Sequence, residues 1–204
     1  MKTNTKILPQ EFFTPDEVVG VAKDLLGKIL VSTVSGIRTS GMIVETEAYK
    51  GPEDRACHAY NNRRTPRTEI MFHEGGVAYV YICYGIHHLF NVVSGKKDQP
   101  HAVLIRGLEP LEGNETMLKR RNLEKFDYRI CGGPGALAQA LGITSELSGI
   151  SLQGPIIQLE DHGINIFDQD IIASKRVGCE SAGEDGLLPW RFRISGNRWA
   201  SPAK

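Results

Sequence analysis

The chain has 204 residues, of which 41% are hydrophobic and 24% are charged, a composition typical of a globular protein large enough to bury a core. Lysine plus arginine and aspartate plus glutamate each number 24, so net charge neither indicates nor excludes a nucleic-acid partner. No apolar run reaches the roughly 18 residues of a membrane span, and no apolar signal region follows the polar start. We therefore expect a soluble protein with no membrane partner, located in the cytoplasm or, in a eukaryote, the nucleus.

The first third of the chain is predicted to contain a helix and a β-hairpin. Thr14 can cap a helix in which Pro15 occupies the first turn and Glu17 completes a capping box. The apolar spacing of this helix continues to about Gly27. The elements expected after it are hairpin strands over 28–33 and 41–49, a short helix over 52–60 and a polar loop over 61–67.

The remainder is predicted to alternate strands with short helices. The expected elements are strands over 77–84, 89–93 and 102–108, helices over 111–122 and 136–141, and short strands and turns up to the end. No repeat, low-complexity run or linker divides the chain. We therefore predict one α+β domain over residues 1–204 with a largely antiparallel sheet, and we expect residues 1–11 to be a flexible N-terminal segment.

The cysteines and histidines give no sign of a metal site. The cysteines lie far apart, at Cys57, Cys83, Cys131 and Cys179. They form no C-x-x-C pair, no histidine follows at zinc-finger spacing, and the adjacent His87 and His88 match no common ligand pattern. We therefore predict no structural zinc, and scattered cysteines fit a reducing compartment.

The β-prone stretch 44–49 carries two carboxylates and an aromatic ring. Because side chains alternate along a strand, Glu45, Glu47 and Tyr49 are expected on one face. Residues two apart are separated by about 6.6–6.8 Å, close enough for one carboxylate to influence the other. An acid beside an aromatic surface suits chemistry on a flat substrate that stacks. The alternative is a half-buried strand whose glutamates pair with distant arginines.

The segment 79–85 is rich in tyrosine and ends in a probable turn. Tyr79 and Tyr81 are expected on one face, with Tyr84 beside the turn. Tyrosines are common in strands, so a purely structural role is one interpretation. The other is a wedge that inserts between stacked bases. Its ring would replace the base stacking that is lost when the duplex opens, a loss of about a few kcal/mol per base step.

Two segments are candidates for holding phosphates. Arg63, Arg64 and Arg67 follow the carboxylate strand in a polar loop, which is either a solvated surface or a cluster that holds a nucleic-acid backbone. Gly133-Pro134-Gly135 opens a predicted helix, and free N–H groups there can bind a phosphate.

Two polar residues interrupt apolar strands. Asn91 is either a satisfied core amide or an amide that tests the edge of a substrate. A buried Arg106 needs a carboxylate partner, and Glu45 or Glu47 would qualify. Such a pair would keep the glutamate ionised and orient a water molecule against it.

In chain order, these segments resemble the alkyladenine (3-methyladenine) DNA glycosylase family, in one register from about Phe12 to Ser201. The matching segments are 12–28, 45–54 with His58, 64–67, 71–72, 79–85, Asn91, 104–106 with 108–113, 133–135 and 176–178. One departure follows Gly135, where the family commonly has lysine and this chain has Ala136. A cation that faces the DNA or the pocket is therefore expected to be missing there.

The resemblance implies a single mixed α/β domain with a curved antiparallel sheet, flanking helices and a protruding β-hairpin. It also implies a monomeric base-excision repair enzyme that needs no metal or cofactor. Such an enzyme binds double-stranded DNA and flips out an alkylated or deaminated purine of the 3-methyladenine, 7-methylguanine or hypoxanthine class. It then hydrolyses the N-glycosidic bond and leaves an abasic site.

The resemblance also implies the catalytic roles. Glu47 would be the general base that activates water for attack on the deoxyribose, and Arg106 would help to hold that water and the carboxylate. The matching segments contain no dedicated lysine nucleophile. We therefore expect a monofunctional hydrolase that does not cleave the DNA strand.

By the same resemblance, the remaining positions bind the base. Tyr49, His58 and Tyr81 would be the walls around the flipped base, with a His58 backbone group reading its edge. Tyr84 would fill the gap left in the duplex. Asn91 would disfavour normal guanine by crowding its exocyclic amine.

Two other functions compete with this one. A non-enzymatic reader of damaged nucleic acid could use the same aromatic pocket, but it has no need of both Glu47 and Arg106. A carbohydrate hydrolase could use Glu45 and Glu47 as paired carboxylates, which inverting enzymes hold about 6.5–9.5 Å apart. Against it, both acids are expected on one strand face, whereas a sugar hydrolase needs them on either side of the bond.

Overall fold

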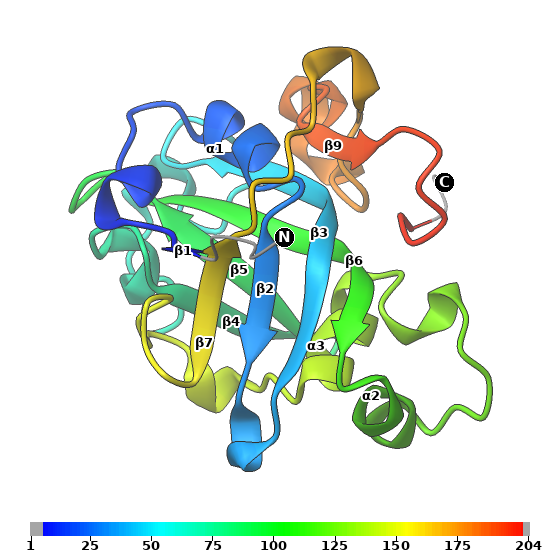
Figure 1. The fold of residues 1–204 in the computed structure, drawn as a ribbon. Helices are drawn as coiled ribbons and strands as arrows, with labels where there is room; N and C mark the ends of the chain where they lie inside the picture. The colour runs from blue at the N-terminus through cyan, green and yellow to red at the C-terminus, as the bar shows by residue number, and fades with distance from the viewer. Residues whose placement is uncertain (1–5, 202–204) are drawn as a thin grey trace.

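One curled antiparallel sheet is the framework of the fold, in a computed structural model that describes residues 6–201. The nine strands of the described chain are β1 (Lys6–Ile7), β2 (Ile29–Ser32), β3 (Thr39–Lys50), β4 (Ala78–Cys83), β5 (His87–Ser94), β6 (His101–Glu112), β7 (Ile157–Asp161), β8 (Ile171–Ser174) and β9 (Arg191–Ile194). They run in the order β1-β7-β2-β3-β6-β5-β4, with β9 pairing with β3 and β8. The sheet curls so that β4 and β5 pass behind β2 and β7 (Figure 1). The predicted α+β class and largely antiparallel, curved sheet are confirmed.

Within residues 6–201, three α-helices flank the sheet: α1 (Val18–Asp24), α2 (Asn114–Arg121) and α3 (Pro134–Leu141). α1 packs against β3 and β6, α3 packs against β5 and β6, and α2 lies on α3 (Figure 1). Short 3₁₀ helices cover Gln10–Phe13, Val34–Gly36, Tyr60–Asn62, Glu69–Phe72, Tyr128–Ile130, Ser145–Leu147, Asp168–Asp170 and Glu180–Leu187. No helix within residues 6–201 is long and apolar enough to cross a membrane.

The strand β3 lies between neighbours on both sides. It pairs with β6 from Lys50↔His101 to Ser40↔Glu112. On its other edge it pairs first with β2 and then, at residues 45–47, with β9. The register with β6 shifts on both sides of Glu45, as at a β-bulge. The carboxylate segment is therefore enclosed in the sheet, and the side chains of residues 44–48 are buried.

The predicted start of the first helix was wrong. The helix begins at Val18 with Glu17 as its N-cap residue, and Thr14 instead ends the preceding 3₁₀ helix. Neither Thr14 nor Glu17 makes the side-chain hydrogen bonds of a capping box in this structure. The buried residues Val18, Val21 and Ala22 fix the helix by packing rather than by its cap.

The predicted helix over 52–60 was also wrong, because a buried aspartate competes for the backbone there. Asp54 Oδ1 accepts from the Ala56 N–H at 2.9 Å, and Asp54 Oδ2 accepts from the Lys50 N–H at 3.3 Å. Such local side-chain hydrogen bonds favour turns over helix. The segment forms successive turns that end in the 3₁₀ helix at Tyr60.

Two further boundaries differ from the predictions. Residues 111 and 112 belong to β6, and the helix predicted over 111–122 begins only at Asn114, after Gly113 turns the chain with a φ of 76°. Residues 1–5 of the expected flexible segment lie outside the described residues. In the rest of that segment, Lys6 and Ile7 form β1 and pair with Asp161 and Glu160 of β7.

Candidate active site

A cavity of about 730 Å³ opens between the end of β3, the β4–β5 hairpin, β6 and the start of α3. Seven predicted site residues that line it are Tyr49, His58, Arg67, Tyr81, Tyr84, Asn91 and Arg106; Gly133 and Gly135 line it at the start of α3. Its volume suits a small planar ligand, since binding pockets commonly measure about 300–1,000 Å³. The fold therefore gathers residues from segments far apart in the sequence around one hollow.

Glu47 lies directly behind the wall of this cavity. Its Oε2 accepts a hydrogen bond from the Tyr49 hydroxyl at 2.8 Å, and its Oε1 accepts one from the Val177 N–H at 2.8 Å. Arg106 Nη1 is 3.4 Å from Oε1. Glu47 is fully buried and does not line the cavity, whereas its three partners do. Each carboxylate oxygen can accept two hydrogen bonds, so Oε2 keeps one free acceptor position.

Glu45 has a different environment, although it is only two residues away. Its carboxylate is fully buried and accepts from Arg106 Nε at 3.0 Å, Arg191 Nε at 2.7 Å and the Ser201 N–H at 2.5 Å. Neither Glu45 nor Arg191 lines the cavity. This contradicts the paired-carboxylate hydrolase, because only one of the two acids is next to the hollow. Arg106 bridges the two glutamates.

Tyr49 is held as a hydrogen-bond donor. Burial raises the pKa of its hydroxyl well above the usual value, and the negative charge of Glu47 raises it further. The neighbouring Arg106 stays charged: burial alone would lower its pKa, but Glu47 and Glu45 raise it. Glu47 therefore meets one neutral hydrogen-bond donor, Tyr49, and one positive ion-pair partner, Arg106.

His58 is fixed as a neutral ring with one defined tautomer. Its Nε2 lies 3.1 Å from Arg67 Nη2, and its Nδ1 lies 2.9 Å from the Tyr79 hydroxyl. Because a guanidinium only donates, Nε2 must accept, so we assign the proton to Nδ1, which donates to Tyr79. Burial lowers the pKa of His58 to about 4, with the charges of Arg67 and Arg63 acting in the same direction.

Tyr81 forms the wall beside this ring. The ring centroids of His58 and Tyr81 are 4.7 Å apart with an edge-to-face angle of 80°, a favourable aromatic geometry. The Arg67 guanidinium lies 4.8 Å from the centre of the Tyr81 ring, a cation–π contact. The structure therefore supports Tyr81 from two sides.

Asn91 is both a satisfied core amide and a cavity residue. Its Nδ2 donates to the carbonyl oxygens of Tyr79 at 3.1 Å and Leu89 at 3.3 Å. Both N–H groups of the amide are used, so the side-chain oxygen is the atom left to face a ligand. The two interpretations of Asn91 are thus compatible.

The turn between β4 and β5 is exposed at the rim of the cavity. Tyr84 is 93% exposed and Ile86 is 72% exposed. Tyr84 and Gly85 both have positive φ, 50° and 74°, which is uncommon for a tyrosine. The exposed turn agrees with the expected hairpin, whose protrusion stays a prediction.

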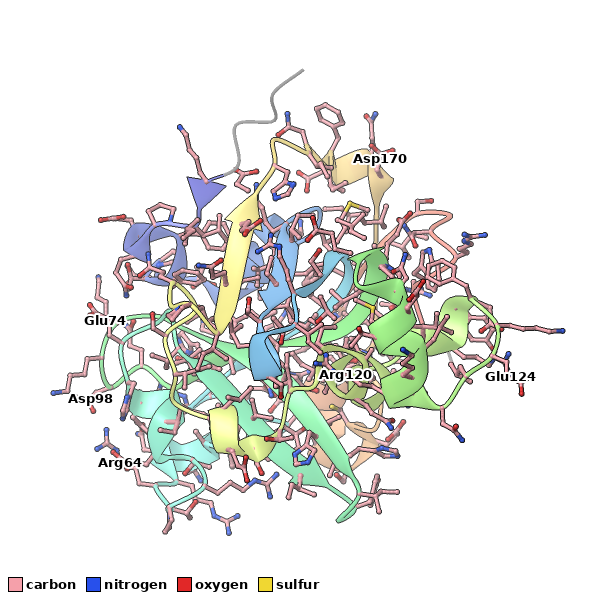
Figure 2. All side chains as sticks on the ribbon, turned by 60° about the horizontal axis from the view of Figure 1, so that its bottom comes forward. Arg64, Glu74, Asp98, Arg120, Glu124 and Asp170 are labelled. Carbon is pink, nitrogen blue, oxygen red and sulfur yellow. The ribbon has the colours of Figure 1, made fainter. Side chains whose placement is uncertain are left out.

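The three arginines predicted to hold phosphates do not form one cluster. Arg64 pairs with Asp98 and, at 3.5 Å, with Glu69 (Figure 2 labels Arg64 and Asp98 on one side of the molecule). Arg67 belongs to the cavity wall. Arg63 is exposed and makes no ion pair within residues 6–201.

The start of α3 approaches the cavity closely. A Cβ atom on Gly135 would lie 3.0 Å from the His87 ring, so only glycine fits there without a shift. Gly133 has a φ of 150°, within the region that favours glycine. Ala136 also lines the cavity. Among the described residues, no group of three or more His, Cys, Asp or Glu side chains is placed to hold a metal ion.

Comparison with known proteins decides the family. The family model described as "Methylpurine-DNA glycosylase (MPG)" matches residues 11–198. The chain belongs to the methylpurine-DNA glycosylase family. It is 49% identical to a Chlamydia abortus protein (92% of this chain, 98% of the relative) and 48% identical to one from Bacillus licheniformis (95% and 96%). A Chlamydia felis protein is 46% identical (93% and 96%), and all three are named "Putative 3-methyladenine DNA glycosylase".

Sequence reasoning missed three contacts in this member of the family. The Val177 N–H that donates to Glu47 is a backbone group, which leaves no residue-specific signal. The partners of His58, Tyr79 and Arg67, come from separate segments, and no local spacing connects them. The only available signal was that residues 176–178 and Arg67 lie in segments that carry the family resemblance.

Proposed function

We propose that this chain is a monofunctional DNA glycosylase that removes damaged purines from double-stranded DNA. It takes an alkylated or deaminated purine of the 3-methyladenine, 7-methylguanine or hypoxanthine class into the cavity and hydrolyses its N-glycosidic bond. It acts as a single-domain monomer without a metal or cofactor. One observation carries the proposal: a buried Glu47 carboxylate, held by two hydrogen-bond donors and an ion pair with Arg106, lies directly behind a ring-lined cavity. Family membership supports it.

The flipped base is bound mainly by stacking between Tyr49, His58 and Tyr81. Aromatic stacking contributes about 1–3 kcal/mol per base and accepts any purine, so it suits a range of damaged bases. A His58 backbone group reads the base edge. The side-chain oxygen of Asn91 lies among these residues, where it leaves no room for the exocyclic amine of normal guanine.

Glu47 activates the attacking water. A water molecule at the free position of Oε2 donates one hydrogen bond to the carboxylate, and Arg106 helps to hold it. Its oxygen attacks C1′ of the deoxyribose while the C1′–N bond breaks and its electron pair leaves with the purine. The water proton passes to Glu47. Alkylation that leaves the purine cationic makes it a good leaving group.

The rim holds the DNA while this happens. Exposed Tyr84 fills the gap that the extruded nucleotide leaves, as wedge side chains do in other duplexes. Arg63, Arg64 and Arg67, together with backbone groups at Gly133 and Gly135, are proposed to hold phosphates. The strand stays intact, because no lysine of the described chain lines the cavity to attack the sugar.

Glu47→Gln tests the proposal. The substitution removes the carboxylate that acts as general base but keeps the size and shape of the side chain. We therefore expect the release of the damaged purine from a duplex to fall by about 10²–10⁴-fold. Affinity for DNA with an abasic-site analogue should stay unchanged. Released base and alkali-sensitive abasic sites measure the rate, and gel shift or fluorescence anisotropy measures the affinity.

The exposed Glu115→Gln serves as the control and should behave as wild type. Full activity of Glu47→Gln would remove Glu47 from the mechanism. A wild-type protein that binds damaged duplexes but releases no base would instead be a non-enzymatic reader.

A further inference from the structure

A buried ion pair lies next to the proposed site without lining the cavity. Arg176 is 3% exposed and Asp54 is 2% exposed. Arg176 Nη2 donates to Asp54 Oδ1 at 2.8 Å, and Nη1 donates to Oδ2. This two-pronged geometry is the most directional form of an ion pair. Both residues lie in segments that carry the family resemblance, and the proposed mechanism uses neither.

The arginine end of the pair supports the strand that carries Glu47. Arg176 Nη1 donates to the carbonyl oxygen of Ala48 at 2.9 Å, between Glu47 and Tyr49 in the chain. The guanidinium carbon lies 4.8 Å from the centre of the Tyr49 ring and 5.2 Å from that of Trp190. Tyr49 therefore rests on a fixed, flat cation.

The residue after Arg176 touches the carboxylate itself. Val177 donates its N–H to Glu47 Oε1 at 2.8 Å. The two described groups that donate hydrogen bonds to Glu47, the Tyr49 hydroxyl and the Val177 N–H, thus belong to residues in direct contact with Arg176 or bonded to it. A shift of Arg176 would move both donors.

Asp54, the other member of the pair, fixes the part of the cavity wall that contains His58. Asp54 accepts from the N–H groups of Lys50 and Ala56, which shapes the turns leading to His58. The Cys57 N–H donates to the Asp54 carbonyl oxygen at 2.9 Å. Burial alone would lower the pKa of Arg176, but the hydrogen bond and negative charge of Asp54 raise it, so Arg176 stays charged at neutral pH.

We infer that Arg176 and Asp54 are positioning residues for base release: one ion pair fixes the two donors to Glu47 and the His58 wall relative to each other. The inference rests on the proposed function. It follows from the contacts, because three segments of the site meet at this pair. Neither residue touches the substrate, so both act on the rate through Glu47, Tyr49 and His58.

The test is Asp54→Asn in the full chain, at a temperature where circular dichroism shows the variant folded. We expect single-turnover base release to fall about 10- to 100-fold, because small misplacements of catalytic groups have effects of that size. Affinity for abasic-analogue DNA should not change. Arg176→Lys keeps the charge but loses the two-pronged geometry, so its rate should fall between those of wild type and Arg176→Gln.

The matched control is Glu160→Gln. Glu160 is also a buried acid, 4% exposed, and pairs with Arg38 at 3.2 Å away from the cavity. It should lower the melting temperature and leave the rate unchanged. Equal rates for Asp54→Asn and Glu160→Gln, or an Arg176→Lys variant as fast as wild type, would overturn the inference.

If Asp54→Asn does not fold, the comparison of Arg176→Lys with wild type still decides the matter. Failure of the proposed function is distinguishable, because the wild-type protein would then release no base. Failure of the inference alone would leave a Glu47-dependent enzyme whose rate is insensitive to the ion pair.

Discussion

The back wall and the rim of the cavity differ in how their side chains are held. At the back wall, Arg106 lines the cavity and donates a hydrogen bond to Glu45, which is buried behind the wall; Glu47, also buried behind the wall, accepts a hydrogen bond from the Val177 N–H. At the rim, Tyr84 and Ile86 are largely exposed. A wall fixed in advance suits the stabilisation of charge in a reaction, whereas exposed groups gain contacts only when a partner arrives. The comparison predicts that wall changes affect stability and rate, and rim changes affect binding.

The largest effect on stability is expected at Glu45. Glu45→Gln removes the charge that faces Arg106 and Arg191 and leaves two buried cations without their main partner. Breaking a buried ion pair costs about 3–5 kcal/mol, so the free energy of unfolding in urea should fall by that amount. The rim variant Tyr84→Ala should stay within about 0.5 kcal/mol of wild type. Equal free energies of unfolding for the two variants would contradict the distinction between the back wall and the rim.

The next effect concerns pH and the neutral His58 ring. The pKa of His58 is lowered to about 4 in the folded protein, against about 6.5 in an unfolded chain. Between these values the unfolded state binds a proton that the folded state does not. Stability is therefore full above about pH 6.5 and falls, by about 3 kcal/mol at most, as the pH drops towards 4.

His58→Gln isolates this contribution, because glutamine can keep both hydrogen bonds but does not titrate. Urea unfolding of both proteins between pH 7 and pH 4 gives the difference between their pH profiles. The variant should lose less stability than wild type over this range. Parallel profiles would show that the ring is protonated in the folded protein as readily as in the unfolded chain.

A change at Tyr84 is expected to have the smallest effect on the stability of the free protein and to act on DNA binding instead. Tyr84→Ala should weaken binding to damaged duplexes by about 1–3 kcal/mol, the usual loss for one aromatic stacking partner. Fluorescence anisotropy measures the change. Phe167→Ala is the control, because Phe167 is 62% exposed but does not line the cavity. An affinity equal to that of wild type would remove the wedge role.

Patterns within single segments predicted most of the fold. Short apolar runs, the first rich in aromatic and β-branched residues, located β4, β5 and β6, and the Gly-Pro-Gly motif located the start of α3 within two residues. The predictions of secondary structure failed where a tertiary contact or a side-chain hydrogen bond determined the local structure. Packing of Val18 fixed the start of α1, and Asp54 turned 52–60 away from helix.

The site was predictable in its residue types but not in its connections. The resemblance pointed to Glu47, Tyr49 and Arg106, and the structure brings them together. The strand pattern alone could not separate Glu45 from Glu47, because their different surroundings come from Arg191 and Ser201, which lie 146 and 156 residues further along the chain than Glu45. Roles that depend on long-range partners need the folded molecule.

The placement of β3 between β6 and β9 has a consequence for local motion. An amide in residues 45–47 has neighbouring strands on both edges, so exposing it requires the sheet to separate. Loops and turns at the mouth open with far less free energy than such a central strand. Hydrogen exchange should therefore be slowest around Glu47 and fastest around Tyr84. Under the proposed function, this difference would let the entrance adapt to lesions of different shapes while the Glu47 carboxylate keeps its place.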